Sequence, residues 1–172
     1  MYIEFLLILT VGVYRYEENK KVYNNDYHNY YRGGYTRARI LKRIKHFKNQ
    51  GEHCFFQPFN FGSEPYLISF GNNVHVASKV TFITHDVTSM MFNYMDSSND
   101  YRIRYGEISI GNNVFIGSNS TILYDVKIGN NVIIGAGSLI NRDVPDGVIV
   151  AGVPGKIVGE FDLYKDKIFM RN

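Results

Sequence analysis

One histidine stands where a regular sequence pattern stops. His85 lies within Thr84-His85-Asp86, where Asp86 takes a place that the preceding repeat gives to an apolar residue. A neutral imidazole accepts a proton near neutral pH, so a histidine held at a fixed point can serve as a general base. The pattern resumes only after an excursion near 84–105. Long excursions from a compact repeat are usually functional or disordered, which makes His85 the first candidate for chemistry.

The interrupted pattern is a strict hexapeptide repeat. Isoleucines recur at intervals of six, and a small or β-branched residue follows each by four positions: Ile110, Ile116, Ile122, Ile128, Ile134 and Ile140. Phe70, Val76 and Phe82 continue the same positions backwards. A helix with 3.6 residues per turn does not produce this period. The hexad is typical of a parallel β-helix, in which each repeat is one short strand plus a turn and the aliphatic side chain points inward.

The tetrapeptide Gly-Asn-Asn-Val sets the length of one coil. Its copies at 111–114 and 129–132 start 18 residues apart, which is three hexads, or one triangular coil. The copy at 71–74 starts 40 residues before the second, which is 18 plus 22. We therefore expect about 22 residues, near 84–105, to loop out of an otherwise regular coil. A filled tube has no deep pocket, so chemistry is expected in grooves along the coil or between subunits.

Length and composition favour one β-helical domain with two appendages. The 172 residues suffice for one core, and a net charge of +3 gives no indication of nucleic-acid binding. We divide the chain into an N-terminal segment 1–51 with a short basic helix, a coil 52–160 and a tail 161–172. A single cysteine, Cys54, allows no internal disulfide and suits a reducing compartment, so we expect a cytoplasmic protein.

The N-terminal segment begins with an apolar stretch, Met1 to Val13, that is too short to span a bilayer and lacks the basic start of a signal peptide. We expect it to pack as a buried strand or helix; its apolarity would allow membrane contact, which is not expected.

A helix is predicted from Thr36, as cap, to Gln50. Its apolar stripe is Ile40, Leu41, Ile44 and Phe47. Its basic side is predicted to be solvated, with attraction of an anionic ligand as the alternative: Arg37, Arg39, Lys42, Arg43, Lys45 and Lys48. Aromatic residues of 52–69 are expected to plug the open end of the tube.

These features together resemble a known family. The hexads, the histidine at the break and the closing Val-Ala-Gly-Val-Pro-Gly-Lys at 150–156 follow the order seen in hexapeptide-repeat acyltransferases, over roughly residues 60–160. The sequence is most similar to acetyl-CoA-dependent O-acetyltransferases of sugars and surface polysaccharides, near the galactoside and maltose acetyltransferases. The resemblance implies a left-handed coil, a homotrimer with active sites between subunits, acetyl-CoA as co-substrate, and a small-molecule or glycan acceptor. No metal is expected.

The resemblance assigns His85 as the general base that deprotonates a sugar hydroxyl. Because Cys54 is far from this motif in the sequence, we expect direct transfer rather than an acyl-enzyme. The resemblance also assigns residues to acetyl-CoA: Gly117, Ser118, Gly135, Ala136, Asn141, Arg142 and Lys156. The Ser118 backbone would meet the thiol end and the Ala136 amide the pantetheine arm. Asn141 and Arg142 replace a hydroxyl-plus-basic pair of the relatives, and Lys156 would lie near the nucleotide phosphates.

The acceptor side is less well marked. Gln57 falls near an amide position of the relatives, Asn60 is a second choice, and Glu64 and Asp86 are available carboxylates. The excursion offers further polar residues for an acceptor: Asn93, Tyr94, Asp96, Arg102 and Arg104.

Other functions stay open at this point. One is N-acetylation of an amino sugar or an antibiotic, and another is a non-catalytic scaffold that kept the coil. A zinc carbonic anhydrase of this fold would need two further histidines downstream, and none follows His85.

Overall fold

The structure, a computed structural model, describes residues 33–170 apart from residues 97 and 99. The expectation for Met1–Val13 lies outside these residues. No helix in the described part of the chain is long and apolar enough to cross a membrane.

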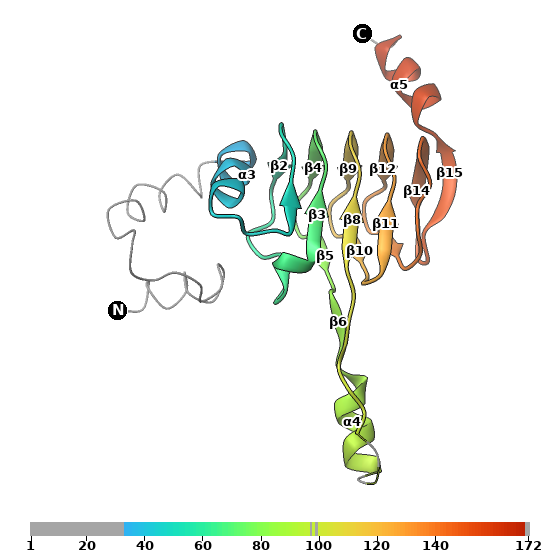
Figure 1. Cartoon of the computed structure of the whole chain (residues 1–172). Helices are drawn as coiled ribbons and strands as arrows, with labels where there is room; N and C mark the ends of the chain where they lie inside the picture. The colour runs from blue at the N-terminus through green and yellow to red at the C-terminus, as the bar shows by residue number, and fades with distance from the viewer. Residues whose placement is uncertain (1–32, 97, 99, 171–172) are drawn as a thin grey trace.

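The chain winds into a parallel β-helix with three faces (Figure 1). The first face contains β2 (Phe55–Phe56), β4 (Val74–Val76), β9 (Val114–Ile116), β12 (Val132–Ile134) and β14 (Val148–Ala151). The second contains β5 (Thr81–Phe82), β10 (Thr121–Ile122) and β13 (Leu139–Ile140). The third contains β1 (Asn49–Gln50), β3 (Ile68–Phe70), which follows the short helix η1 (Pro65–Leu67), then β8 (Ile108–Ile110) and β11 (Val126–Ile128). Neighbouring strands of each face come from successive coils, as the hexad predicts.

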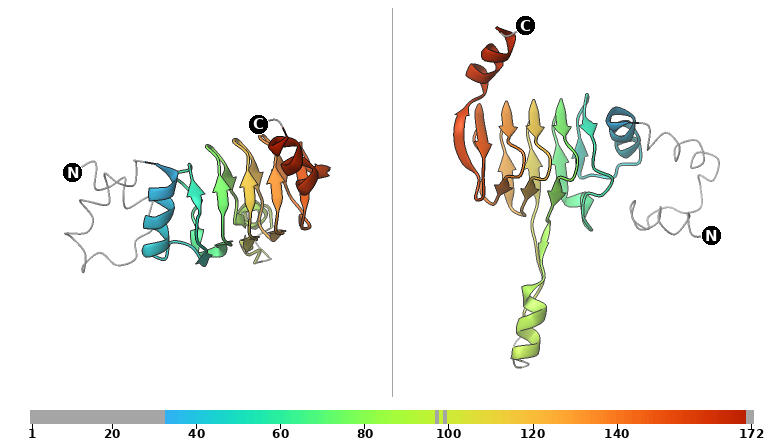
Figure 2. Two further views of the ribbon diagram at one scale, coloured as in Figure 1. Left: turned by 90° about the horizontal axis from the view of Figure 1, so that it is seen from above. Right: turned by 180° about the vertical axis from the view of Figure 1, so that it is seen from behind.

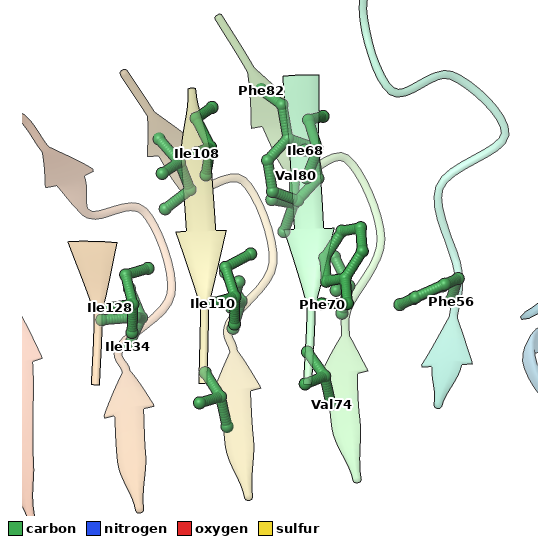
Figure 3. Close-up of a cluster of buried hydrophobic side chains, with 14 of the residues drawn as sticks. Phe56, Ile68, Phe70, Val74, Val80, Phe82, Ile108, Ile110, Ile128 and Ile134 are labelled. Carbon is green, nitrogen blue, oxygen red and sulfur yellow. The ribbon is translucent and has the colours of Figure 1, made fainter. Parts of the chain in front are cut away.

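The hexad isoleucines fill the tube. All six are at most 4% exposed, and several line up along the coil axis in Figure 3. Two inward positions carry hydroxyls instead: Ser120 and Ser138 both donate to the carbonyl of Gly135, at 3.0 and 2.6 Å. These buried polar groups therefore keep hydrogen bonds inside an apolar core.

The repeated Gly-Asn-Asn-Val forms the corner between the third and first faces. The Asn130 side-chain oxygen accepts from the Asn112 backbone N–H at 2.9 Å, and the Asn112 oxygen accepts from Asn72 N–H at 2.8 Å. The second asparagine adopts a left-handed conformation, with φ of 56° at Asn113. A Cβ on Gly111 would lie 2.7 Å from the carbonyl oxygen of Gly129 on the next coil, so this position requires glycine. We call this edge the asparagine corner.

The N-terminal helix is shorter than predicted. Helix α3 spans Gly34–Arg43, and Thr36 lies inside it rather than capping it. Lys45, with φ of 52°, ends it: Lys45 N–H donates to Lys42 O and His46 N–H to Leu41 O. This is a Schellman ending without the usual glycine, so no residue type marked the end of the helix in the sequence. Strand β1 then pairs with β3, which starts the coil before residue 52.

Helix α3 covers the open end of the tube, and this buries one predicted surface residue. Arg37 is 3% exposed, and its Nη1 donates to the carbonyls of Phe56 and Gln57 at 2.7 and 3.0 Å. Carbonyls of the first coil have no preceding coil to pair with, and Arg37 satisfies two of them. Its place on a solvated face was therefore predicted wrongly. The aromatic plug is confirmed by Phe56 and Phe61, which are buried together with Phe47.

The predicted excursion forms an arm that projects from the coil (Figures 1 and 2). Its base is a two-stranded antiparallel ribbon of β6 (His85–Asp86) and β7 (Arg104–Tyr105), and it carries helix α4 (Thr88–Met95). The coil continues in register on both sides, since Ile68 pairs with Ile108.

At the other end of the coil, β15 (Lys156–Glu160) pairs antiparallel with β14 and leads into helix α5 (Phe161–Phe169).

Candidate active site

His85 lies where the coil passes into the arm, and a carboxylate holds it there. Its Nδ1 is 2.7 Å from Oε2 of Glu64, and the Thr84 hydroxyl donates to the same oxygen at 2.6 Å. The Glu64 side chain is 12% exposed and that of His85 is 30% exposed. The carboxylate is therefore shielded, while the imidazole remains open to a reactant.

The first coil brings Glu64 to this place. Gln50 and Phe70 are partners in neighbouring coils and lie 20 residues apart, and Glu64 precedes Thr84 by the same 20 residues. Glu64 therefore stacks one coil before the Thr84-His85 pair. The sequence predicted Glu64 only as an acceptor contact; its place beside His85 depends on the 20-residue length of the first coil, which no regular hexad marks.

The pair has the arrangement of a general base. An ionised carboxylate only accepts hydrogen bonds, so Nδ1 of His85 carries the proton toward Glu64. The lone pair of the neutral ring then lies on Nε2, on the side away from Glu64. A hydroxyl group within hydrogen-bond reach of Nε2 could transfer its proton there.

Asp86 points to the other side of the ribbon. Its carboxylate accepts from Thr88 N–H at 2.8 Å and from the Tyr124 hydroxyl at 3.2 Å. The hydrogen bonds from Thr88, followed by those from Tyr124 and the charge of Arg104, lower the pKa of Asp86. The Asp86 carboxylate thus joins the base of the arm to the coil. Less of its hydrogen-bonding capacity remains for the acceptor role predicted from the sequence.

Four of the predicted cofactor residues form one edge of the prism, between the first and second faces. Gly117 stacks on Gly135 and Ala136 of the next coil, and Gly135 stacks on Ala151. A Cβ on Gly117 would lie 2.5 Å from the Ala136 nitrogen, so only glycine fits. The Ser118 hydroxyl lies 3.4 Å from that of Ser78. We call this edge the small-residue corner; its lack of large side chains leaves backbone amides accessible to an extended ligand.

Lys156 lies at the end of the small-residue corner, whereas Asn141 and Arg142 do not. Lys156 pairs with Ala151, and its side chain is exposed. Asn141 and Arg142 belong to the corner between the second and third faces, which also carries His85. Hydrogen bonds stack this corner coil by coil, from Ile83 N–H to Ile122 O and from Leu123 N–H to Ile140 O, both 2.9 Å. The predicted cofactor residues thus divide between two corners.

His85 and Ser118 lie at opposite edges of the second face. About four residues of extended chain separate these edges, which corresponds to roughly 13 Å. A single acyl group cannot contact the imidazole and the Ser118 backbone of the same chain across that width. The two edges can form one site only if they come from different subunits.

The two predicted amide residues have local roles in the first coil. The Gln57 side-chain oxygen accepts from Ser78 N–H at 2.8 Å, which places Gln57 on the small-residue corner. The Asn60 side-chain oxygen accepts from Gly62 N–H at 2.8 Å in the turn that follows. The structure therefore brings Glu64, and neither amide, to His85.

Comparison with known proteins identifies the class that this fold and site define. Residues 107–142 match the family described as bacterial transferase hexapeptide (six repeats). The chain is 51% identical over 123 residues to protein CapG of Staphylococcus aureus, a match that covers 69% of each protein. The chain therefore belongs to the hexapeptide-repeat family of bacterial acyltransferases.

Solved structures share the fold. The structure of a galactoside acetyltransferase in complex with coenzyme A is 26% identical, with a TM-score of 0.55 over 76% of this chain and 72% of that one. A maltose O-acetyltransferase from Clostridium difficile 630 is 21% identical, with a TM-score of 0.53 over 92% of this chain and 84% of that one. Together with the family match, these structures confirm the left-handed parallel β-helix.

Proposed function

We propose that this protein transfers the acetyl group of acetyl-CoA to a hydroxyl of a sugar in a surface-polysaccharide precursor, with His85 as the general base. The hydrogen bond between Glu64 and His85, at 2.7 Å beside an open side of the imidazole, carries this proposal. The likeness to a galactoside acetyltransferase bound to coenzyme A supports the sugar acceptor and the co-substrate. The lone Cys54 suits a reducing environment, which supports a cytoplasmic reaction as part of this proposal.

The reaction proceeds in one acyl transfer. The acceptor oxygen attacks the thioester carbonyl carbon as its proton moves to Nε2 of His85, and the carboxylate of Glu64 stabilises the imidazolium that forms. The tetrahedral intermediate then collapses, the carbon–sulfur bond breaks, and the coenzyme A thiolate takes the proton from His85. Ser118 backbone N–H is our candidate donor to the oxyanion.

Cys54 is unsuited to an acyl-enzyme route. Its side chain fills the inward position equivalent to Val74 and is 5% exposed. Burial raises the pKa of the Cys54 thiol, which disfavours the nucleophilic thiolate. Because Cys54 cannot serve as the nucleophile, the acetyl group would pass directly from acetyl-CoA to the acceptor while both are bound.

We assign the acetyl-CoA arm to the small-residue corner, with Lys156 at its phosphate end. A flat edge of Gly117, Ser118, Gly135 and Ala136 lets pantetheine approach the backbone, and an exposed ammonium at the end of the coil attracts the nucleotide phosphates. Arg142 would contribute from the His85 corner of a neighbouring subunit.

A homotrimer is part of the proposal, because the two corners of one chain cannot share an acyl group. The first face offers the apolar surface for assembly. A column of mainly apolar side chains points outward from its strands: Phe55, His75, Phe115, Ile133 and Ile149. The third face instead presents Ser69, Ser109 and Lys127.

The test compares His85→Asn with His53→Asn, the same change at an exposed histidine in the first coil. Transfer from radiolabelled acetyl-CoA is measured against a panel of sugars with free hydroxyls and of amino sugars. In His85→Asn we expect kcat/KM to fall by about 100-fold or more while the Kd for acetyl-CoA changes little. His53→Asn should resemble the wild type. Equal turnover in both variants would overturn the base assignment, and turnover only with amines would replace O-acetylation by N-acetylation.

A further inference from the structure

The base of the arm carries an open cavity of about 220 Å³ that the proposed chemistry does not use. Its walls run from Asp86 on β6 and Thr88, the first residue of α4, to Arg102 and to Arg104 on β7. His85 and Asp86 are consecutive strand residues and point to opposite sides of the ribbon. Their partners show this, since His85 contacts Glu64 and Asp86 contacts Tyr124. The cavity therefore lies on the side of the ribbon opposite the imidazole.

One buried hydroxyl in this cavity lacks a partner. Ser89 lines the cavity and is 7% exposed, and its Oγ makes no hydrogen bond within the described residues. Buried polar groups are nearly always hydrogen-bonded, so a buried hydroxyl without a partner indicates a place for a ligand or a water molecule. The Ser89 Oγ is shielded from solvent in this structure, so it can donate to and accept from a ligand hydroxyl only after the side chain rotates toward the cavity.

Two aromatic rings form another wall. The rings of Phe92 and Tyr101 lie 5.6 Å apart at 58°. Asn93 fixes their separation, because its side chain donates to Tyr101 O and accepts from Tyr101 N–H, both at 2.8 Å. This wall is held before any ligand arrives. Aromatic faces bury the apolar C–H surface of a pyranose ring, while hydroxyls such as that of Ser89 bind its polar edge.

The arginines give the cavity a cation that can turn toward a ligand. Arg104 is held by Asp125 at 2.7 Å. Arg102 is 87% exposed, and its Nε lies 3.5 Å from Oδ2 of Asp100, which is 80% exposed. Exposed pairs of this kind contribute little, so an anionic ligand can replace Asp100 as the partner of Arg102.

We propose that this cavity is a carbohydrate subsite that binds a sugar unit carrying an anionic group, next to the unit that is acetylated. Phe92 and Tyr101 cover the ring face, Ser89 binds a hydroxyl, and Arg102 binds the carboxylate of a uronic acid or the phosphate of a sugar phosphate. This inference rests on the proposed function and narrows its acceptor to a glycan with an acidic unit. It adds a contact remote from the reacting hydroxyl, whose binding energy can position the acceptor.

Binding of small probes to the full-length protein tests the subsite without acetyl-CoA. The probes are methyl glucuronide, glucose 1-phosphate and neutral methyl glucoside, with Kd measured by ligand-observed NMR. We expect at least one anionic probe to bind about 10-fold more tightly than methyl glucoside, and the tighter of the two identifies the carboxylate or the phosphate as the natural group. Equal affinity for all three probes, or no binding, would overturn the proposal.

Variants locate the site. Arg102→Gln should remove the preference for the anionic probe, and Ser89→Ala should weaken all three probes by about 5- to 10-fold. Arg39→Gln, on an exposed position of α3, is the charge-matched control and should bind as the wild type does. His85→Asn should also bind the probes normally, because the imidazole lies across the ribbon.

If Arg102→Gln and Ser89→Ala bind like the wild type, the cavity is not the site. Absence of acetyl transfer by the wild type would instead remove the proposed function while leaving these binding results intact.

Discussion

The Oε2 atom of Glu64 accepts hydrogen bonds from two neighbours, the Thr84 hydroxyl and the His85 ring. In the proposed reaction Glu64 acts through His85 and so is a positioning residue: it would fix the tautomer and the ring orientation, and its charge would stabilise the imidazolium. Thr84 in turn is 1% exposed, and its hydroxyl holds the same carboxylate oxygen as the imidazole does.

Glu64→Gln tests this role. The amide keeps the shape of the side chain but removes the charge, so we expect kcat to fall at least about 10-fold with the KM for acetyl-CoA unchanged. Steady-state kinetics and a thermal melt of the same sample separate catalysis from folding. Glu52→Gln, which alters an exposed partner of Lys42, is the control. A parallel loss of kcat and melting temperature would show that Glu64 is only structural.

His46 makes the stability of the fold depend on pH. The ring is half-buried against Phe47 and Phe61, and burial lowers the pKa of His46 from 6.5 to about 4. Between these values the unfolded chain binds a proton that the folded chain does not. The stability that the neutral, half-buried His46 gives is therefore fully present above pH 6.5. As the pH falls toward 4, the free energy of unfolding decreases by at most about 3 kcal/mol.

Urea unfolding between pH 7 and pH 4 measures this effect. Wild type and His53→Gln should lose stability more steeply than His46→Gln as the pH falls from 6.5 to 4, since only the last lacks the buried ring. Three parallel curves would contradict the assignment.

At the scale of the element, each hexad places one side chain in the tube and its neighbour outside. Ile128 is 3% exposed, whereas Lys127 on the same strand is exposed. Ile128→Asp puts an unpaired carboxylate among aliphatic side chains and should cost on the order of 5 kcal/mol, enough to prevent folding. Lys127→Asp should fold. Circular dichroism and soluble yield distinguish the two, and a folded Ile128→Asp protein would contradict the coil.

At the scale of the whole molecule, the proposed site needs more than one chain. Phe115 lies at the middle of the outward column on the first face and is 46% exposed. If this face joins subunits, Phe115→Glu would bury a charge in the interface, dissociate the trimer and abolish transfer. Sedimentation equilibrium should give three times 19.8 kDa for the wild type and a lower mass for the variant. Thr81→Glu, on the second face, should remain trimeric; dissociation of both, or of neither, would place the interface elsewhere.

The repeat determined most of the fold by itself. A period of six leaves one geometry in which every isoleucine is buried, and the 18- and 40-residue spacings of Gly-Asn-Asn-Val located the arm. These signals are local and periodic, so they can be recognised in the sequence without knowledge of tertiary contacts. The place of His85 at the base of the arm was also predicted this way, because a break in a strict period is visible in the sequence.

Contacts between residues far apart in the sequence were decided only by the tertiary structure. Glu64 reached His85 through the 20-residue first coil, whose irregular sequence hid its length. Arg37 was buried because the first coil leaves carbonyls unpaired. Lys45 ended helix α3 although no glycine, the usual sequence signal for a helix end, is present there. The stacking of the coils divides the predicted cofactor residues between two corners. The turn of the arm buries the Ser89 hydroxyl without a hydrogen-bond partner among the residues that the structure describes. A hexad records which side chains point inward; it does not record which outward side chains meet.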